Sequence, residues 1–122
     1  PDAGVRAALR AMHADPETVT DDRVAQYGDL MTGQGKAFVA RAEQFTLPDP
    51  AAAMARITAP TTIVWGAQDA VLPSDHGAVF ARHIPDAEVI VLDGVGHLPQ
   101  AEATAEVAQV IRDMAGRIGA SE

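Results

Sequence analysis

Cysteine is absent from this chain of 122 residues, and serine occurs only twice, as Ser74 and Ser121. Without cysteine the chain forms no disulfide framework and no zinc–thiolate site, and it offers no thiolate nucleophile. Basic residues are also scarce: nine Lys and Arg stand against seventeen Asp and Glu, so the formal net charge is −8. This acidic balance disfavours nucleic acids and anionic membranes as partners, because their phosphates would be repelled.

Long apolar runs are lacking as well. No segment approaches the roughly 20 apolar residues needed to cross a bilayer, and no signal peptide with a basic start precedes a short apolar core. The sequence therefore predicts a cytoplasmic protein. The chain begins with Pro1-Asp2 and not with Met, which we interpret as a piece of a longer polypeptide or a trimmed chain. Apolar residues make up 48% of it, enough to exclude intrinsic disorder.

The N-terminal half carries helix signals. Apolar residues recur at helical spacing and predict three helices, each with one apolar face; the three stripes are Val5, Ala8, Leu9 and Met12; Val24, Tyr27, Leu30 and Met31; and Phe38, Ala42 and Phe45. Thr20 is the predicted N-cap of the second helix. Asp49-Pro50 predicts the N-cap and first residue of a short helix over Ala51 to Ile57. Core packing explains these stripes without any further function.

The second half changes character after Ala59-Pro60. Two short β-branched runs, Thr61 to Trp65 and Glu88 to Leu92, are continuous in apolar character, which is typical of parallel strands covered on both faces. A helix with Ser74 as its N-cap is predicted between them, and a last helix carries a stripe from Val107 to Ile118. The order strand–helix–strand–helix indicates the α/β class. Two strands alone leave both sheet edges unpaired, so we expect them to belong to a larger sheet.

Two loops carry residues with catalytic chemistry, and both follow a predicted strand. Asp69 lies four residues past the first strand and His97 five residues past the second. In open α/β sheets, ligands bind at the carboxyl ends of the strands, so both side chains are expected at one edge. An Asp that accepts the Nδ1–H of a His leaves Nε2 free as a base. Either residue could instead be an ordinary loop residue.

An ordered set of motifs resembles the C-terminal part of an α/β-hydrolase-fold enzyme. The motifs are Ile57-Thr58-Ala59-Pro60-Thr61-Thr62-Ile63-Val64-Trp65-Gly66-Ala67-Gln68-Asp69, Val71-Leu72-Pro73, Ile84-Pro85-Asp86-Ala87 and Gly96-His97. In that family the triad follows the chain order nucleophile, acid, histidine. The resemblance implies that Asp69 is the acid and His97 the base. It also implies an incomplete α/β-hydrolase fold, with residues 1–47 as a helical cap, 48–118 as the C-terminal part of the core and 119–122 as a flexible tail.

The resemblance further implies a small, ester-like substrate and no cofactor or metal. Val71 and Leu98, which follow the two triad positions, are expected to line the substrate pocket, or else simply to pack. The Gly-x-Ser-x-Gly nucleophile motif of the family is absent. Ser74 falls at a helix N-cap and Ser121 in the tail, so we expect no nucleophile in this chain and no hydrolysis by it alone.

Three readings remain open at this stage. The parent enzyme is a serine hydrolase acting on esters or related acyl and carbon–carbon bonds; or it is a relative with an Asp nucleophile, a dehalogenase or epoxide hydrolase; or the chain is a non-catalytic assembly module. The expected partner is the missing N-terminal half or a second copy joined by strand exchange. His76 and His83 lack a third ligand for a metal site. Trp65 is expected in the core or at the substrate, and Glu102 at the surface.

Overall fold

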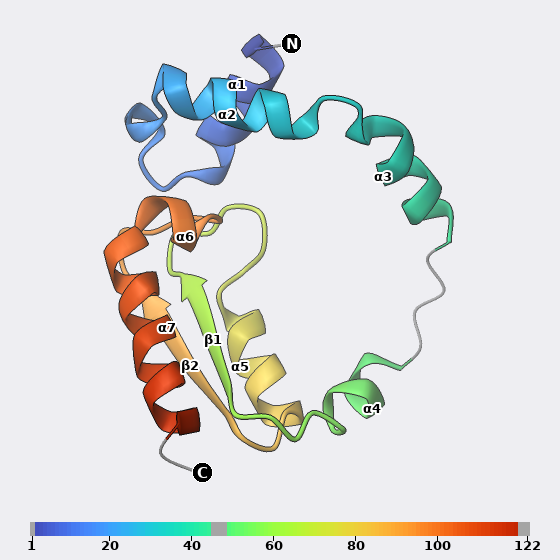
Figure 1. The fold of residues 1–122 in the computed structure, drawn as a ribbon, viewed down its shortest axis with the longest axis vertical. Coiled ribbons are helices and arrows are strands. Elements are labelled where there is room, and N and C mark those ends of the chain that lie inside the picture. Colours follow the sequence, from blue (N-terminus) through green and yellow to red (C-terminus); the bar gives the residue numbers. More distant parts are fainter. Residues whose placement is uncertain (1, 45–48, 120–122) are drawn as a thin grey trace.

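The structure, a computed structural model, describes residues 2–44 and 49–119, except for the side chains of Lys36, Phe38, Ala42 and Glu43. In chain order the elements are α1 (Asp2–Met12), the 3-10 turn η1 (Pro16–Thr18), α2 (Asp21–Met31), α3 (Gln34–Glu43), α4 (Pro50–Met54), β1 (Thr61–Gly66), α5 (Asp75–His83), β2 (Ala87–Leu92), α6 (Pro99–Glu102) and α7 (Thr104–Gly119). A helical segment thus precedes a strand–helix–strand–helix unit (Figure 1), and the predicted α/β class is confirmed.

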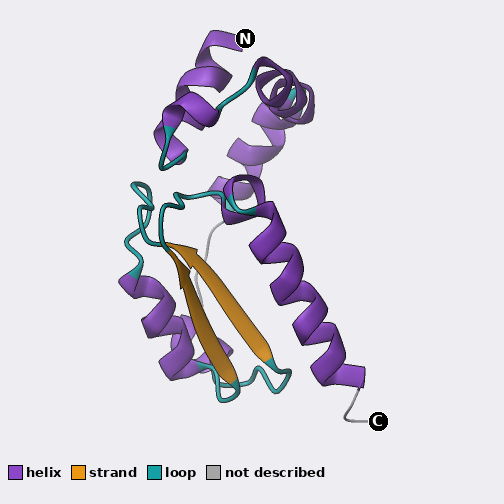
Figure 2. Cartoon of the chain, turned by 90° about the vertical axis from the view of Figure 1, so that its left-hand side faces the viewer, coloured by secondary structure: helices purple, strands orange, loops and turns teal. Residues whose placement is uncertain are grey.

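The two predicted strands form a parallel pair. Thr61 lies opposite Ala87 at one end of the register, and Gly66 lies opposite Leu92 at the other. Figure 2 shows this pair between α5 on one face and α7 on the other. The carboxyl ends of both strands point toward α1 and α2 (Figure 1). The loops that leave the strands therefore meet the helical segment.

The helical segment contains a small apolar core. Leu9 of α1, Val19 after η1 and Val24 of α2 are buried together, and Val5, Tyr27 and Leu98 pack against them. The predicted stripes of α1 and α2 thus serve as packing faces in part: Ala8 of α1 and Leu30 and Met31 at the end of α2 remain exposed. As predicted, the Thr20 hydroxyl caps α2, accepting the Arg23 N–H at 3.3 Å.

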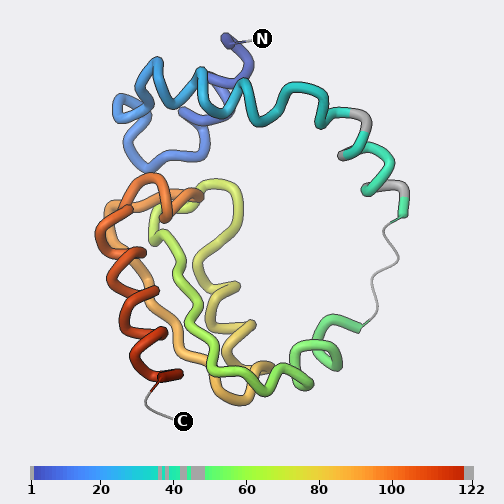
Figure 3. The backbone as a smooth tube through the Cα atoms, viewed as in Figure 1, coloured from blue at the N-terminus to red at the C-terminus, as the bar shows by residue number. Residues whose placement is uncertain are grey.

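The chain then leaves this core. α3 leads away from this core, and α4 lies beside α5 in the strand unit (Figure 3). The predicted stripe of Phe38, Ala42 and Phe45 lies outside the described side chains and residues. Asp49 caps α4 through the N–H of Ala51 at 3.0 Å, as predicted. The helix ends at Met54, and not at Ile57 as expected, because Arg56 and Ile57 bond back to Ala53 and Met54 as turns.

Other local predictions hold in part. Ser74 occupies the N-cap position of α5 but makes no side-chain capping bond, and its backbone is already helical. The short elements η1 and α6 were not predicted; Asp15 caps η1 by accepting the Glu17 N–H at 2.9 Å. α7 extends to Gly119, and the rest of the predicted tail lies outside the described residues. No helix in the described ranges has the length and apolar character that a membrane span requires.

The molecule has an unusually large surface for its mass. It exposes 8470 Å², whereas a compact monomer of 12.7 kDa exposes about 6,200 Å². Within the described residues β1 pairs with β2 alone, so one edge of each strand has no strand beside it. Large apolar side chains on several elements share this exposure, among them Leu30, Phe80, Val91 and Ile111. The sheet is therefore open, in agreement with an incomplete α/β-hydrolase fold.

Candidate active site

Asp69 is fixed by the loop that follows β1. Its Oδ1 accepts the backbone N–H groups of Val71 at 2.8 Å and Leu72 at 2.9 Å. The loop starts at Gly66, where a Cβ atom would lie 2.0 Å from the carbonyl oxygen of Gly96, so only glycine permits this approach. The Asp69 side chain is only 4% exposed. The carboxylate is thus oriented by the backbone of its own turn.

His97 completes the pair from the loop after β2. Its Nδ1 lies 2.9 Å from Asp69 Oδ2 and 3.1 Å from Oδ1. The side chain is 26% exposed, so the ring is reachable from outside. The structure therefore brings the two predicted residues together at the carboxyl edge of the sheet. With Nδ1 facing the carboxylate, Nε2 is the nitrogen left for proton transfer.

The pKa of Asp69 is lower than that of an ordinary aspartate. Burial of the carboxylate raises this pKa, but hydrogen bonds from Leu72, His97 and Val71 together outweigh burial and lower it. The carboxylate is thus ionised at neutral pH and can stabilise a positive charge on His97.

A glutamine bridges the two loops, and sequence reasoning missed it. Gln68 Nε2 donates to Asp93 Oδ1 at 2.9 Å, and Gln68 Oε1 accepts the N–H of Gly94 at 2.6 Å. Its backbone N–H also donates to the carbonyl of Val95 at 2.9 Å. The only sequence signal was its place beside Asp69. These bonds hold the Asp69 loop at a fixed distance from the His97 loop.

A small pocket of about 150 Å³ opens beside the pair; it is lined by Val64, Trp65, Gly66, Asp69, Leu72, His97 and Pro99. Val71 and Leu98 were the predicted lining residues. Their neighbours in the sequence, Leu72 and Pro99, line the pocket in their place. Val71 is exposed, and Leu98 packs against the helical core.

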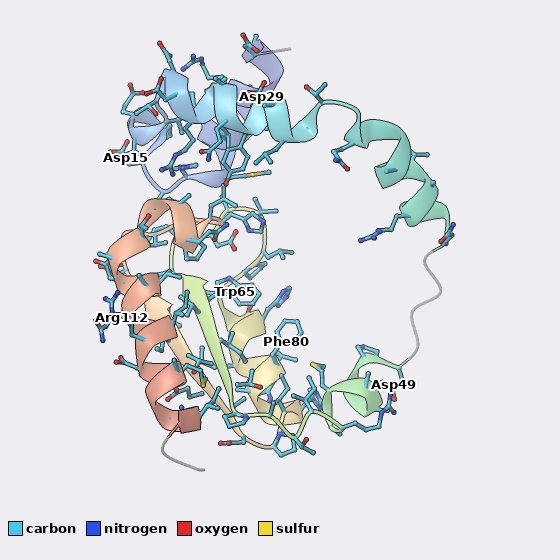
Figure 4. All side chains as sticks on the ribbon, viewed as in Figure 1. Asp15, Asp29, Asp49, Trp65, Phe80 and Arg112 are labelled. Atoms are coloured by element: carbon cyan, nitrogen blue, oxygen red, sulfur yellow. The ribbon has the colours of Figure 1, made fainter. Side chains whose placement is uncertain are left out.

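Trp65 forms one wall of the pocket. Its Nε1 donates to the carbonyl of Leu72 at 3.2 Å. Its ring stacks on Phe80 and meets the ring of His76 edge-on, with both ring centroids 6.2 Å away. Figure 4 shows Trp65 and Phe80 next to each other along α5. Trp65 therefore both packs on α5 and contacts the pocket, so the two alternatives considered for it are compatible.

Metal-binding side chains do not gather here. Within residues 2–44 and 49–119, no group of three or more His, Asp or Glu side chains could hold a metal ion. The site instead contains an oriented base, His97, beside an ionised acid, Asp69. Such a pair activates a hydroxyl or water for attack on a carbonyl carbon.

Comparison with known proteins finds hydrolases that are similar to this chain. A 2-hydroxy-6-oxononadienedioate/2-hydroxy-6-oxononatrienedioate hydrolase of Paraburkholderia phymatum is 32% identical over 120 residues, which are 93% of this chain and 41% of that enzyme. Lipase 3 of a Moraxella species is 36% identical over 55 residues, which are 45% of this chain and 18% of the lipase.

Among solved structures, a serine hydrolase involved in carbazole degradation (the CarC enzyme) superposes with a TM-score of 0.82 at 21% identity. The match covers 95% of this chain and 47% of that one, so this chain spans less than half the length of all three relatives. The model of the Alpha/beta hydrolase family matches residues 1–110. The chain belongs to the Alpha/beta hydrolase family.

Proposed function

We propose that Asp69 and His97 are the acid and base of a catalytic triad in a serine hydrolase that cleaves an ester or a related acyl or carbon–carbon bond. The observation that carries the proposal is the 2.9 Å bond between His97 Nδ1 and Asp69 Oδ2. It joins loops that leave two adjacent parallel strands, at the edge where α/β proteins bind ligands. Membership of the Alpha/beta hydrolase family supports the same chemistry.

The mechanism assigns one role to each residue. His97 Nε2 removes the proton of a serine hydroxyl, whose oxygen adds to the substrate carbonyl carbon, and the carbonyl becomes an oxyanion. Asp69 stabilises the resulting imidazolium through Nδ1–H. His97 then gives its proton to the leaving group as the bond to the acyl carbon breaks. Water, deprotonated by His97 in turn, then adds to the acyl carbon. The bond between this carbon and the serine oxygen breaks, the acid is released, and His97 returns the proton to the serine oxygen.

The nucleophile in this proposal comes from outside the chain. Ser74 precedes α5 at its N-cap position, and Ser121 lies beyond the described residues; neither stands in the nucleophile motif of the family. The open sheet and about 2,200 Å² of surface beyond that of a compact monomer favour a partner that extends the sheet. This partner is an N-terminal half that carries the serine, and a second copy joined by strand exchange is the alternative. The chain alone is then inactive.

The substrate in this proposal is a small carbonyl compound. The pocket beside the pair, about 150 Å³, is open to solvent, and in this proposal the partner that carries the serine completes it. The relatives' names, a hydrolase of 2-hydroxy-6-oxononadienedioate and a lipase, suggest a dienedioate or an ester. Assays with both substrate types distinguish these two classes.

The test is complementation. The chain is co-expressed with a polypeptide that carries the nucleophile strand, and hydrolysis of a chromogenic short-chain ester is measured. His97→Ala is expected to lower kcat by about 10³-fold or more. His83→Ala, on the exposed end of α5, is the control and should leave kcat unchanged. Full turnover by His97→Ala would disprove its role as the base.

A second measurement locates the nucleophile. The chain alone, treated with phenylmethylsulfonyl fluoride, is expected to remain unlabelled in a mass spectrum. Stoichiometric label on Ser74 would contradict a nucleophile from outside. In the complemented enzyme, label on the partner's serine is expected. A substrate ester trapped on an aspartate instead would assign the enzyme to the dehalogenase or epoxide hydrolase type.

A further inference from the structure

The loop that carries His97 rests on a carboxylate that the sequence analysis placed at the surface. Glu102, at the end of α6, is half-buried beneath this loop, so that expectation was wrong. Its Oε2 accepts the N–H of Gly96 at 2.9 Å, and its Oε1 accepts the N–H of Leu98 at 3.1 Å. One carboxylate thus binds the backbone on both sides of the histidine.

The same carboxylate reaches the helical segment. Glu102 Oε2 also accepts the N–H of Ala14 at 2.8 Å, 88 residues earlier in the chain. The N–H of His97 itself donates to the carbonyl of Met12 at 2.7 Å. The three amides at 96, 97 and 98 are therefore all bound, two by Glu102 and one by the end of α1.

The approach of the two segments is close enough to require glycine. A Cβ atom on Gly96 would lie 2.5 Å from the carbonyl oxygen of Met12 and 2.6 Å from the nitrogen of Ala14. A third bond spans the same junction, because Arg23 of α2 donates to the carbonyl of Ala101 at 2.7 Å. The His97 loop, α6 and the helical segment therefore meet at one joint, with Glu102 at its centre.

The short helix α6 explains how Glu102 reaches this place. Pro99 starts the helix, and the N–H groups of Ala101 and Glu102 both bond back to the carbonyl of Leu98. This single turn folds the chain back under the loop it has just left. The one signal in the sequence was a Glu five residues after the predicted base. No periodic pattern distinguishes it from a solvent-exposed acid.

We propose that Glu102 is a positioning residue for His97, and that it couples the helical segment to the base. It touches no reacting atom and acts through the backbone of the loop. Its bonds are charge-assisted, hence stronger than neutral ones. A neutral glutamine would present one acceptor oxygen and an NH₂ group, and the NH₂ would face an N–H donor. That His97 acts as a base rests on the proposed function, whereas the hydrogen bonds from the loop backbone to Glu102 do not depend on it.

Hydrogen exchange by NMR on the full chain tests the proposal, with Glu102→Gln compared with Glu106→Gln. Glu106 lies exposed on α7, so its variant removes the same charge away from the joint. In Glu102→Gln the amides of Gly96 and Leu98 are expected to exchange at least about tenfold faster. The amides of the β1–β2 ladder serve as the internal control and should keep their rates in both variants.

A second readout concerns the histidine ring. In the unmodified chain the ring ¹⁵N shifts of neutral His97 are expected to report one tautomer, with the proton on Nδ1. In Glu102→Gln these shifts should move toward the average of both tautomers. One outcome would refute the positioning role. The Ala14 amide would exchange faster in Glu102→Gln, while the exchange rates of Gly96 and Leu98 and the ¹⁵N shifts of the His97 ring stayed unchanged. Glu102 would then only hold the helical segment in place.

The unmodified chain provides a measurement for the case in which Glu102→Gln does not fold. The amides of Gly96 and Leu98 are then expected to exchange at least about tenfold more slowly than in an unstructured peptide. Exchange at peptide rates would overturn the proposal. None of these readouts needs turnover, so a failure of the triad assignment and a failure of this inference are separate results.

Discussion

The helical segment of residues 2–44 and the strand unit of residues 49–119 differ in how their buried groups are arranged. In the first, Leu9, Val19 and Val24 form an apolar cluster with side chains that reach as little as 2–3% exposure. In the second, the apolar residues of β1 are only half-buried, although their sequence is typical of a covered strand. The buried apolar residues of the strand unit, Ile84, Val95 and Ala103, lie outside that cluster. This unit also buries a carboxylate, that of Asp69, within a network of backbone bonds.

The two regions therefore depend to different degrees on apolar burial and on directional bonds. Helix pairing excludes water from one apolar cluster, so the helical segment gains mainly from burial. The strand unit holds its two loops by directional bonds while its sheet edge and outer helix faces stay open. A site can therefore be ordered at the end of a sheet that is itself incomplete. The following substitutions test this contrast in order of expected effect.

The largest effect is expected in the helical cluster. Leu9→Ala should lower the free energy of unfolding by about 2–5 kcal/mol, because it removes buried methyl groups and leaves a cavity. Leu30→Ala, at a side chain that is 63% exposed, should cost no more than about 0.5 kcal/mol. Urea unfolding followed by circular dichroism measures both. An equal loss in the free energy of unfolding for the two variants would mean that Leu9 is not part of a hydrophobic core.

A smaller effect is expected where the two regions meet. Gly96→Ala should cost about 1–3 kcal/mol, since its Cβ would push Met12 and Ala14 away from the His97 loop. Gly116→Ala is the matched control: nothing lies within 4 Å of its Cβ in α7, so it should stabilise by about 0.5–1 kcal/mol. Opposite signs in urea unfolding are the expected result. A neutral Gly96→Ala would show that the two segments do not meet closely.

The polar network of the strand unit should respond to pH. Because the pKa of Asp69 is lower in the folded chain, the carboxylate stabilises the fold above its unfolded pKa, near 3.8. This contribution is lost as the pH falls through the folded-state pKa. Asp69→Asn should therefore cost about 1–2 kcal/mol at pH 7, and the difference from the unmodified chain should shrink below pH 3.8.

Urea midpoints at pH 7 and in acid measure the Asp69 effect. Asp75→Asn, at an exposed carboxylate in the first turn of α5, should stay within about 0.5 kcal/mol of the unmodified chain at pH 7. A difference between Asp69→Asn and the unmodified chain that stays constant into acid would contradict an ionised, hydrogen-bonded Asp69.

The smallest effect is expected on the open surface of the strand unit. Ile111 of α7 is 64% exposed, so Ile111→Gln should change the free energy of unfolding by less than about 0.5 kcal/mol. A cost above about 2 kcal/mol would show that the outer face of α7 is covered in solution. Size-exclusion chromatography with light scattering on both proteins would then reveal whether a second copy provides the cover.

Much of the local structure was predictable, because its causes are local. Continuous β-branched runs predicted β1 and β2, and the Thr20 and Asp49 caps predicted where α2 and α4 begin. The pairing of Asp69 with His97 was also predictable, since parallel neighbours bring their carboxyl ends to one edge. The resemblance of the ordered motifs to α/β-hydrolase-fold enzymes agrees with the family to which the chain belongs.

Periodicity, capping and loop position act within a few residues, so the sequence was enough to predict the longer helices, the two parallel strands and the two residues at the sheet edge. Only the tertiary structure decided that Gln68 bridges the loops and that Glu102 joins the His97 loop to Ala14. It also decided that Leu30 and Ile111 stay exposed. These outcomes depend on which distant segments meet, and a hydrogen bond across 88 residues leaves no pattern along the chain.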